Sequence, residues 1–393
     1  MDQHFSISPP LSLYIHLPWC VRKCPYCDFN SYSARDDAIP ESEYVEALLR
    51  DLDNDSVQLG KRCIKTVFMG GGTPSLFSPE ALNRVLTKVR TDWSLSSGVE
   101  ITLEANPGTI DQGKFKEFNA IGINRLSIGV QSFNNESLRE LGRIHDGTDG
   151  LRAVELARKS GFDNLNIDLM YGLPGQTKEM CLADLRTAVR LAPSHISYYQ
   201  LTLEPRTLFY SRPPALPHES VVCDMEDIGR QIFLNHGYTQ YEVSAYAQSG
   251  MRSRHNLNYW EFGDYLGIGA GAHGKLTQIA THLIHRSSKS RQPKQYMESA
   301  SHGAQQRQVL TPEDTVFEFM LNALRLQEGF SLSLFRERTG MSVDAISNHL
   351  ESAVEQGLLS IDGSHLSTTA LGRRFLNDLI MLFMPDPMRP VRG

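Results

Sequence analysis

The sequence predicts an α/β protein: a partial (βα)6 TIM-like barrel followed by a mostly helical, winged-helix-like C-terminal domain. Between residue 11 and about 200, short apolar runs rich in β-branched residues alternate with longer amphipathic stretches. This alternation is typical of βα units around a parallel sheet. Six such units are too few for a closed eight-stranded barrel, so the barrel is expected to be open or partial.

Chemically unusual residues follow most of the expected strands. In parallel α/β folds the active site lies at the carboxyl ends of the strands, so we expect these residues to converge. The expected strands are 11–16, 64–69, 99–104, 124–130, 163–170 and 195–201, and the expected helices lie near 41–56, 79–92, 112–120, 135–160 and 178–191.

Three domains are expected. The partial barrel occupies 1–205, a connector over 206–300 completes it and carries the segment RHNLNYW, and the C-terminal domain occupies 301–393. The connector begins with a Pro-rich stretch and a helix near 219–236. In the last domain we expect helices near 312–326, 331–338 and 343–357, a hairpin over 358–369 and a final helix near 370–382.

Composition narrows the class of protein. The chain has 393 residues, 40% of them hydrophobic, and a net charge of −6, so it can bury a substantial core and has no basic excess for nucleic acid. The region 331–393 has six arginines, no lysine and seven acids, which disfavours DNA binding. No apolar run approaches the roughly 18 residues of a membrane span, and the first residues resemble no leader. We expect a cytoplasmic protein.

Three of the six cysteines, Cys20, Cys24 and Cys27, form a C-x3-C-x2-C motif directly after the first strand. Three thiolates suit a [4Fe-4S] cluster and leave one iron open, which can chelate the amino and carboxylate groups of S-adenosylmethionine (SAM). The alternative is structural zinc, but no second pair of ligands follows at a suitable spacing. The scattered Cys63, Cys181 and Cys223 are expected to be small buried hydrophobes.

Other polar motifs stand near strand ends. The glycines of GGGTP, 70–74, let the backbone approach a ligand closely, although an ordinary tight turn explains the motif equally well. Glu104, Gln131, Arg143 and Asp168 can bind an amine, ribose hydroxyls and a carboxylate. Each of them alone is equally well explained as a helix cap or a surface pair.

The segment 254–260 brings His255 together with Asn256, Tyr259 and Trp260. Imidazole is a good axial ligand for haem iron, and aromatic rings pack on a porphyrin face. The alternative is a hydrogen-bonded histidine in an aromatic loop, and the same interpretation applies to His273.

The segments YIHLPWCVRKCPYCDFN, GGGTPS, LEANPGT, RLSIGVQSF, LGRIHD and IDLMYGLPGQT occur in this order. In this order and spacing they resemble the oxygen-independent coproporphyrinogen oxidase-like branch of the radical SAM superfamily. The resemblance extends over nearly the whole chain. It implies a partial barrel, a [4Fe-4S] cluster and bound SAM.

Within this branch, coproporphyrinogen III dehydrogenases differ from haem chaperones. The dehydrogenases have a fourth cysteine two residues after the third, where this chain has Phe29, and a longer N-terminal arm than the 13 residues before Tyr14. The HNxxYW segment, His255 to Trp260, is associated with haem binding in the chaperones. The resemblance therefore implies a haem chaperone, with radical decarboxylation of coproporphyrinogen III propionates as the alternative.

By the same resemblance, Cys20, Cys24 and Cys27 ligate the cluster and His255 is the candidate for haem. The residues expected to contact SAM are Tyr14, Tyr26, Gly71, Gly72, Thr73, Glu104, Gln131, Arg143 and Asp168. Haem would be cargo for respiratory haem proteins, which implies contact with the inner face of the membrane. The sequence leaves a homodimer open. An RNA-modifying radical SAM enzyme or a cluster-bearing scaffold is a third class, and the acidic balance argues against RNA.

Overall fold

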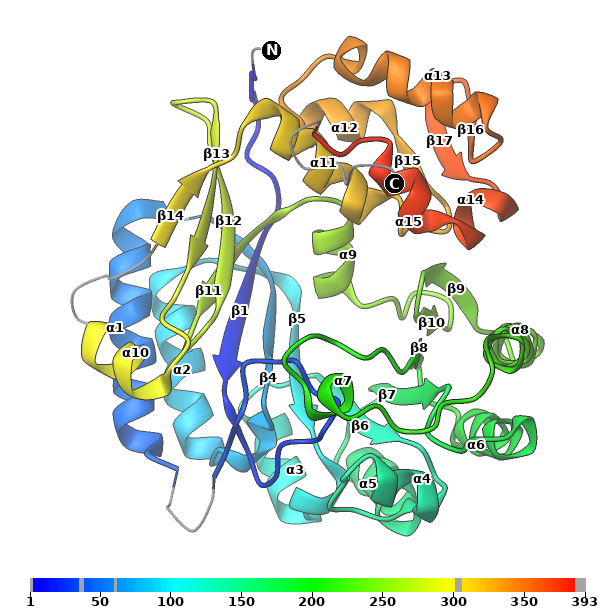
Figure 1. Ribbon diagram of the computed structural model, residues 1–393. Coiled ribbons are helices and arrows are strands. Elements are labelled where there is room, and N and C mark those ends of the chain that lie inside the picture. Colours follow the sequence, from blue (N-terminus) through cyan, green and yellow to red (C-terminus); the bar gives the residue numbers. More distant parts are fainter. Residues whose placement is uncertain (1–2, 35–38, 60–61, 301–305, 386–393) are drawn as a thin grey trace.

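The computed structural model describes residues 3–34, 39–59, 62–300 and 306–385. Its centre is a curved sheet in which six parallel strands follow one another in sequence order, as the predicted (βα)6 barrel requires (Figure 1). These strands are β1 (Leu11–Leu17), β4 (Ile64–Gly71), β5 (Leu95–Ala105), β6 (Arg125–Gln131), β7 (Asn164–Tyr171) and β8 (His195–Gln200).

Helices cover the outer face of the sheet, and the main hydrophobic core lies between them and the strands (Figure 1). Val67 and Met69 of β4 point into this core and are fully buried. The covering helices are α1 (Glu41–Leu59), α2 (Pro79–Asp92), α3 (Gln112–Ala120), α4 (Asn135–Glu140), α5 (Gly147–Lys159), α6 (Lys178–Leu191) and α8 (Glu219–Asn235).

The single helix expected near 135–160 is wrong, because the chain breaks between α4 and α5. Gly142 has a φ of 68°, which ends the first helix in a left-handed conformation that favours glycine. Asp146 then starts α5 with a capping box that it shares with Asp149. Arg143 lies in the break, so the interruption places a candidate site residue on a loop.

The inner face of the sheet is polar. Side chains alternate between the two faces of a strand, so Ser12, Tyr14 and His16 face inward from β1 while Leu13 and Ile15 face the helices. The other strands follow the same rule. Their inward side chains include Thr66, Phe68, Glu100, Glu104, Arg125, Ser127, Gln131, Asn166, Asp168, His195 and Tyr199.

Strands within residues 206–300, together with one strand over 306–309, extend the sheet at both of its edges. On one edge β11 (Asp264–Ile268) pairs in parallel with β1 and is followed by antiparallel β12 (His273–Gln278), β13 (Leu283–Ser288) and β14 (Gln306–Val309). On the other edge lie β10 (Ala245–Ala247) and β9 (Thr239–Glu242). The short helices of this region are α7 (Leu208–Ser211), α9 (Arg254–Trp260) and α10 (Pro293–Ser299).

The C-terminal region has its own core and a small three-stranded sheet, and the predicted hairpin is present. Phe319 packs edge-on against Phe330 and Phe335, and also against Phe262, which follows α9. The expected final helix is interrupted at Phe375. The elements are α11 (Pro312–Ala323), β15 (Phe330–Ser331), α12 (Leu332–Thr339), α13 (Ser347–Glu355), β16 (Leu359–Asp362), β17 (His365–Thr368), α14 (Ala370–Arg374) and α15 (Leu376–Met381).

Two further features are the burial of the scattered cysteines and the composition of the helices. Of the scattered cysteines, Cys181 is buried as expected, whereas Cys63 is half-buried and Cys223 is exposed. Among the helices of the described residues, none combines the length and the apolar composition that crossing a bilayer requires.

Candidate functional site

The three clustered cysteines lie on a loop that follows β1 and is held by backbone hydrogen bonds. Its two ends form a short parallel pair, β2 (Trp19–Cys20) and β3 (Tyr32–Ser33). Lys23 Nζ donates to the carbonyl oxygens of Phe29 and Ser31, at 3.0 and 3.2 Å, which ties the middle of the loop to its end. These contacts fix the path of the loop before any ligand is bound.

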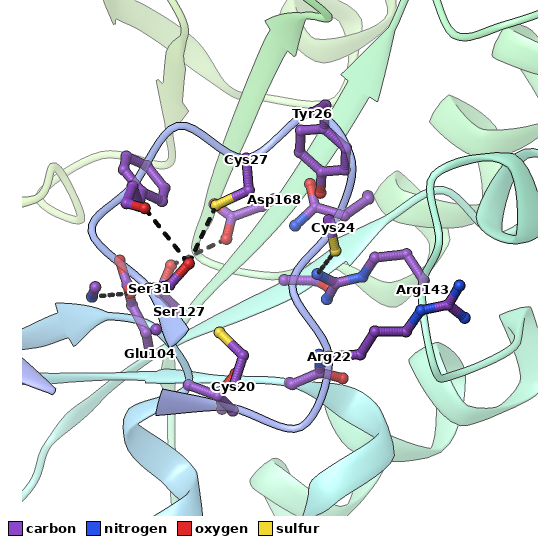
Figure 2. A pocket seen from close by; sticks show the side chains of 18 of the residues that line it. Cys20, Arg22, Cys24, Tyr26, Cys27, Ser31, Glu104, Ser127, Arg143 and Asp168 are labelled. Carbon is purple, nitrogen blue, oxygen red and sulfur yellow. Dashed lines mark hydrogen bonds between the residues drawn. The ribbon is translucent and has the colours of Figure 1, made fainter. Parts of the chain in front are cut away.

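The sulfur atoms of Cys20, Cys24 and Cys27 lie on the inner side of this loop and face the pocket that it surrounds (Figure 2). None is in a disulfide. Arg143 Nη1 donates to Cys24 Sγ at 3.7 Å, and Cys27 Sγ lies 3.8 Å from Ser31 Oγ. Burial raises the pKa of the Cys20 and Cys27 thiols and so favours their protonated forms. A bound metal offsets this effect, because each sulfur then binds the metal as a thiolate.

The donor set suits a cluster better than a single ion. A zinc ion draws its ligands to about 2.0–2.3 Å, which requires a compact group of donors. Within the described ranges of the chain, no three His, Cys, Asp or Glu side chains are close enough to hold one metal ion. Cys20, Cys24 and Cys27 carry free thiols and line one pocket, which matches the three-thiolate ligation of a [4Fe-4S] cluster.

The glycines of GGGTP bring β4 against the backbone of the cysteine loop. Gly72 N donates to Leu17 O at 2.9 Å, and Thr73 N donates to Trp19 O at 2.7 Å. A Cβ atom on Gly72 would come within 2.5 Å of Trp19 O, so no larger residue fits without displacing the loop. Glycine is required here for the packing of two backbone segments, in addition to the expected approach of the backbone to a ligand.

Two carboxylates lie at the base of the pocket. Glu104 Oε2 accepts from Gly71 N at 3.0 Å, and burial together with the charge of Asp168 raises the pKa of Glu104 to about 7. Asp168 accepts from Asn166 Nδ2 at 2.7 Å and from Ser127 Oγ at 3.4 Å, and burial raises its pKa as well. This pair favours a positively charged ligand, which would relieve the repulsion between the two carboxylates.

Gln131 is held in an unusual conformation. Its φ is 69°, in the left-handed region that non-glycine residues rarely adopt. Tyr199 donates from its hydroxyl to Gln131 Oε1 at 2.7 Å, and Arg143 Nη2 donates to Gly129 O at 2.7 Å. Backbone strain of this kind is characteristic of ligand-binding sites, where the surrounding structure holds the residue in place.

The structure brings together nearly all of the residues predicted for the cluster and SAM. Tyr14 is the exception, because it lies in the neighbouring pocket described next. The predicted residues that line the first pocket are Cys20, Cys24, Tyr26, Cys27, Gly71, Gly72, Thr73, Glu104, Gln131, Arg143 and Asp168. Sequence reasoning missed Ser31, Ser127 and Tyr199, which also line it; the alternation of polar residues along the strands could have identified the last two.

A second pocket, of about 430 Å³, lies beside the first, and the exposed ring of Phe29 borders both. It contains His255 and Tyr14, far apart in sequence. Aromatic side chains dominate it, as expected of a site for a large apolar ligand. Its lining is Tyr14, His16, Phe29, Asn30, Phe68, His255, Asn256, Tyr259, Tyr265, Gly271, His273 and Arg291.

His255 lies on α9, a helix and not the aromatic loop of the alternative interpretation. Ser253 caps this helix, because its side chain accepts from Asn256 N. The His255 ring stacks on Phe68 with a centroid separation of 4.9 Å, and its Nδ1 atom lies 2.8 Å from Thr66 Oγ1. Nε2 has no hydrogen-bond partner among the described residues. His273 is exposed on the rim of the same pocket.

Comparisons with known proteins agree with this geometry. The family model of the radical SAM superfamily matches residues 14–188, and the model of the HemN C-terminal domain matches residues 310–375. Among solved structures, coproporphyrinogen III oxidase HemN from Escherichia coli superposes with a TM-score of 0.81. That match covers 96% of this chain and 90% of HemN at 24% sequence identity, which shows a shared fold.

Curated relatives resemble the chain along its whole length. The heme chaperone HemW of Escherichia coli K12 is 47% identical over 378 residues, covering 96% of this chain and 99% of the relative. HemW of Haemophilus influenzae is 46% identical, with the same coverage of both chains. HemW of Bacillus subtilis is 36% identical, covering 95% of this chain and 99% of the relative. The chain therefore belongs to the HemW family within the radical SAM superfamily.

Proposed function

We propose that this chain is a haem chaperone that binds haem in the pocket around His255 and delivers it to respiratory haem proteins. The observation that carries the proposal is His255, which lines a pocket rich in aromatic side chains and whose buried Nε2 atom has no hydrogen-bond partner among the described residues. The family relationship supports it, because the HemW relatives are named as heme chaperones. Delivery to respiratory proteins would bring the chain to the inner face of the membrane.

The hydrogen bonds around His255 prepare it to bind iron. Thr66 Oγ1 donates to Ser12 Oγ at 2.8 Å, so its oxygen accepts the proton of His255 Nδ1. The Nε2 lone pair is then free for a metal. Burial also lowers the pKa of His255 to about 3, so the imidazole is neutral at physiological pH. A neutral imidazole with a fixed Nδ1 proton is the form that binds haem iron through Nε2.

The first pocket would hold the [4Fe-4S] cluster and SAM. Cys20, Cys24 and Cys27 would supply the three thiolates, and the bound cluster would supply an open iron and an electron for SAM. Glu104 and Asp168 would face the positive charges of SAM. The other residues proposed to contact it are Tyr26, Gly71, Gly72, Thr73, Gln131 and Arg143.

Glu104 gives this proposal a pH dependence. Its carboxyl, with a pKa of about 7, must be ionised to attract the sulfonium of SAM and to accept a hydrogen bond from its amino group. We therefore expect SAM affinity to fall about tenfold between pH 8 and pH 6, as the ionised fraction falls. Calorimetric titration of the reconstituted protein at the two pH values measures this change. Glu104→Gln should bind SAM more weakly with little pH dependence; an unchanged dependence in this variant would contradict the assignment.

The alternative function is that of a coproporphyrinogen III dehydrogenase, which the close fold similarity to HemN favours. The two functions differ in what they do with a tetrapyrrole. We expect the anaerobically reconstituted protein to bind one haem per chain. With SAM, a reductant and carboxyl-labelled coproporphyrinogen III, we expect it to release no labelled carbon dioxide. Sustained formation of protoporphyrinogen IX would contradict the proposed function and establish the alternative.

A further inference from the structure

The described lining of the second pocket contains an arginine but no acidic side chain. Among its lining residues in the described part of the chain there is no aspartate or glutamate, although the whole chain carries a net charge of −6. The lining includes Arg291, which is exposed at the rim of the pocket. Partial burial, together with the charges of Arg286 and Arg291, lowers the pKa of the neighbouring His273. The pocket is thus suited to a ligand that is apolar over most of its surface and anionic at one edge.

Hydrogen bonds to the main chain hold residue 291 in place and leave the side chain of Arg291 available to bind a ligand. Its carbonyl oxygen accepts from Asn30 Nδ2 at 2.8 Å and from Tyr32 OH at 3.1 Å. Asn30 Nδ2 also donates to Ala270 O, so residue 291 is fastened between the cysteine loop and the β11–β12 connection. With the described residues, the guanidinium makes one hydrogen bond, a long one of 3.5 Å from Nε to Asn30 Oδ1. No carboxylate of the described residues pairs with it within 4.0 Å.

The other arginine near this pocket is already neutralised. Arg286 pairs with Glu318 and donates to the Tyr265 hydroxyl, and it does not line the cavity. Arg291 therefore differs from Arg286 in having no acidic partner within the described part of the chain. A planar guanidinium with free Nη donors is the side chain best shaped to bind a carboxylate through two parallel hydrogen bonds.

We infer that Arg291 binds a propionate of the haem and thereby fixes which edge of the tetrapyrrole faces outward. This inference rests on the proposed function. His255 is only 2% exposed and lies deep in the pocket, whereas Arg291 is at the rim. Iron would thus be held from inside the barrel, the apolar edge of the ring would lie among Tyr14, Phe68 and Tyr259, and the carboxylates would meet Arg291.

The test is a pair of titrations, one with haem and one with haem dimethyl ester, which lacks the propionate charges. We expect the unaltered protein to bind haem more tightly than the ester, by about fivefold at low salt, because exposed ion pairs are modest in strength. Arg291→Gln should lose that preference and bind the ester as before. Arg291→Lys keeps the positive charge but cannot form the two parallel hydrogen bonds, so it should retain only part of the preference. The main-chain contacts of residue 291 do not depend on the side chain, so these variants are expected to fold.

Arg152→Gln is the matched control, because Arg152 is exposed on the outer helix α5. It should leave both titrations unchanged. A preference for haem over the ester that persists in Arg291→Gln would overturn the assignment of Arg291 and leave the haem site standing. A failure of the unaltered protein to bind either compound would overturn the proposed function itself.

Discussion

Cys24→Ala is expected to remove most of the cluster iron and sulfide from the anaerobically reconstituted protein, about a tenfold loss or more, because two thiolates cannot replace three. Cys24 is half-buried and its sulfur accepts a weak hydrogen bond from Arg143, so the fold should survive the change. Iron and sulfide analysis, with the visible absorption of the cluster, measures the effect. Circular dichroism checks that the secondary structure is kept.

Cys223→Ser is the control for this experiment. Cys223 is exposed on α8, outside the pocket of the three clustered cysteines. The Cys223→Ser protein should bind as much iron and sulfide as the unaltered protein. If Cys24→Ala retained as much cluster as Cys223→Ser, the assignment of the three-cysteine loop as the cluster site would be wrong.

His255→Ala is expected to weaken haem binding by at least about tenfold and to change the Soret spectrum, because the proposed axial ligand is lost. Binding of iron-free protoporphyrin IX should change much less, since this ligand has no iron to coordinate. The difference between the two ligands separates loss of coordination from distortion of the pocket. His236→Ala is the control, because His236 is exposed at the end of α8.

An equal loss of haem and protoporphyrin binding in His255→Ala would show that the residue supports the pocket and does not ligate iron. His255→Ala also removes the stacking on Phe68 and the hydrogen bond to Thr66, so the variant could bind less haem because it is less stable. A thermal melt measures this loss of stability. We expect a moderate loss of stability, about 2–4 kcal/mol, for removal of a buried ring of this kind. The folded variant should still bind SAM.

The six strands could be predicted from the sequence because each is a short, local segment with apolar residues, bounded by polar or turn-forming residues. The predicted run 64–69 lies within β4, Ile64–Gly71. The break between α4 and α5 was missed because apolar residues recur at helical spacing on both sides of it. Its signals were present in the left-handed Gly142 and in the capping box of Asp146, and both depend on single residues more than on periodicity.

The first pocket could be predicted because its residues follow strands that are neighbours in both sequence and space. The second could not, because it depends on β11 pairing with β1 and on α9 reaching Thr66, contacts that span some 190 to 250 residues. Tyr14 shows the limit most clearly. Its position on β1 was predicted, yet its ring lines the His255 pocket, where it packs against Phe68 of the neighbouring strand.

Transfer of haem to another protein is the most direct test of a chaperone. The haem-loaded, cluster-containing chain can be mixed with membranes whose respiratory haem proteins have been prepared without haem, and the spectra of carrier and acceptor followed together. We expect haem to leave the carrier and to appear in the acceptor, with little transfer from His255→Ala. Haem that stays on the carrier, or that reaches the acceptor no faster from the chain than from albumin, would contradict the proposed function.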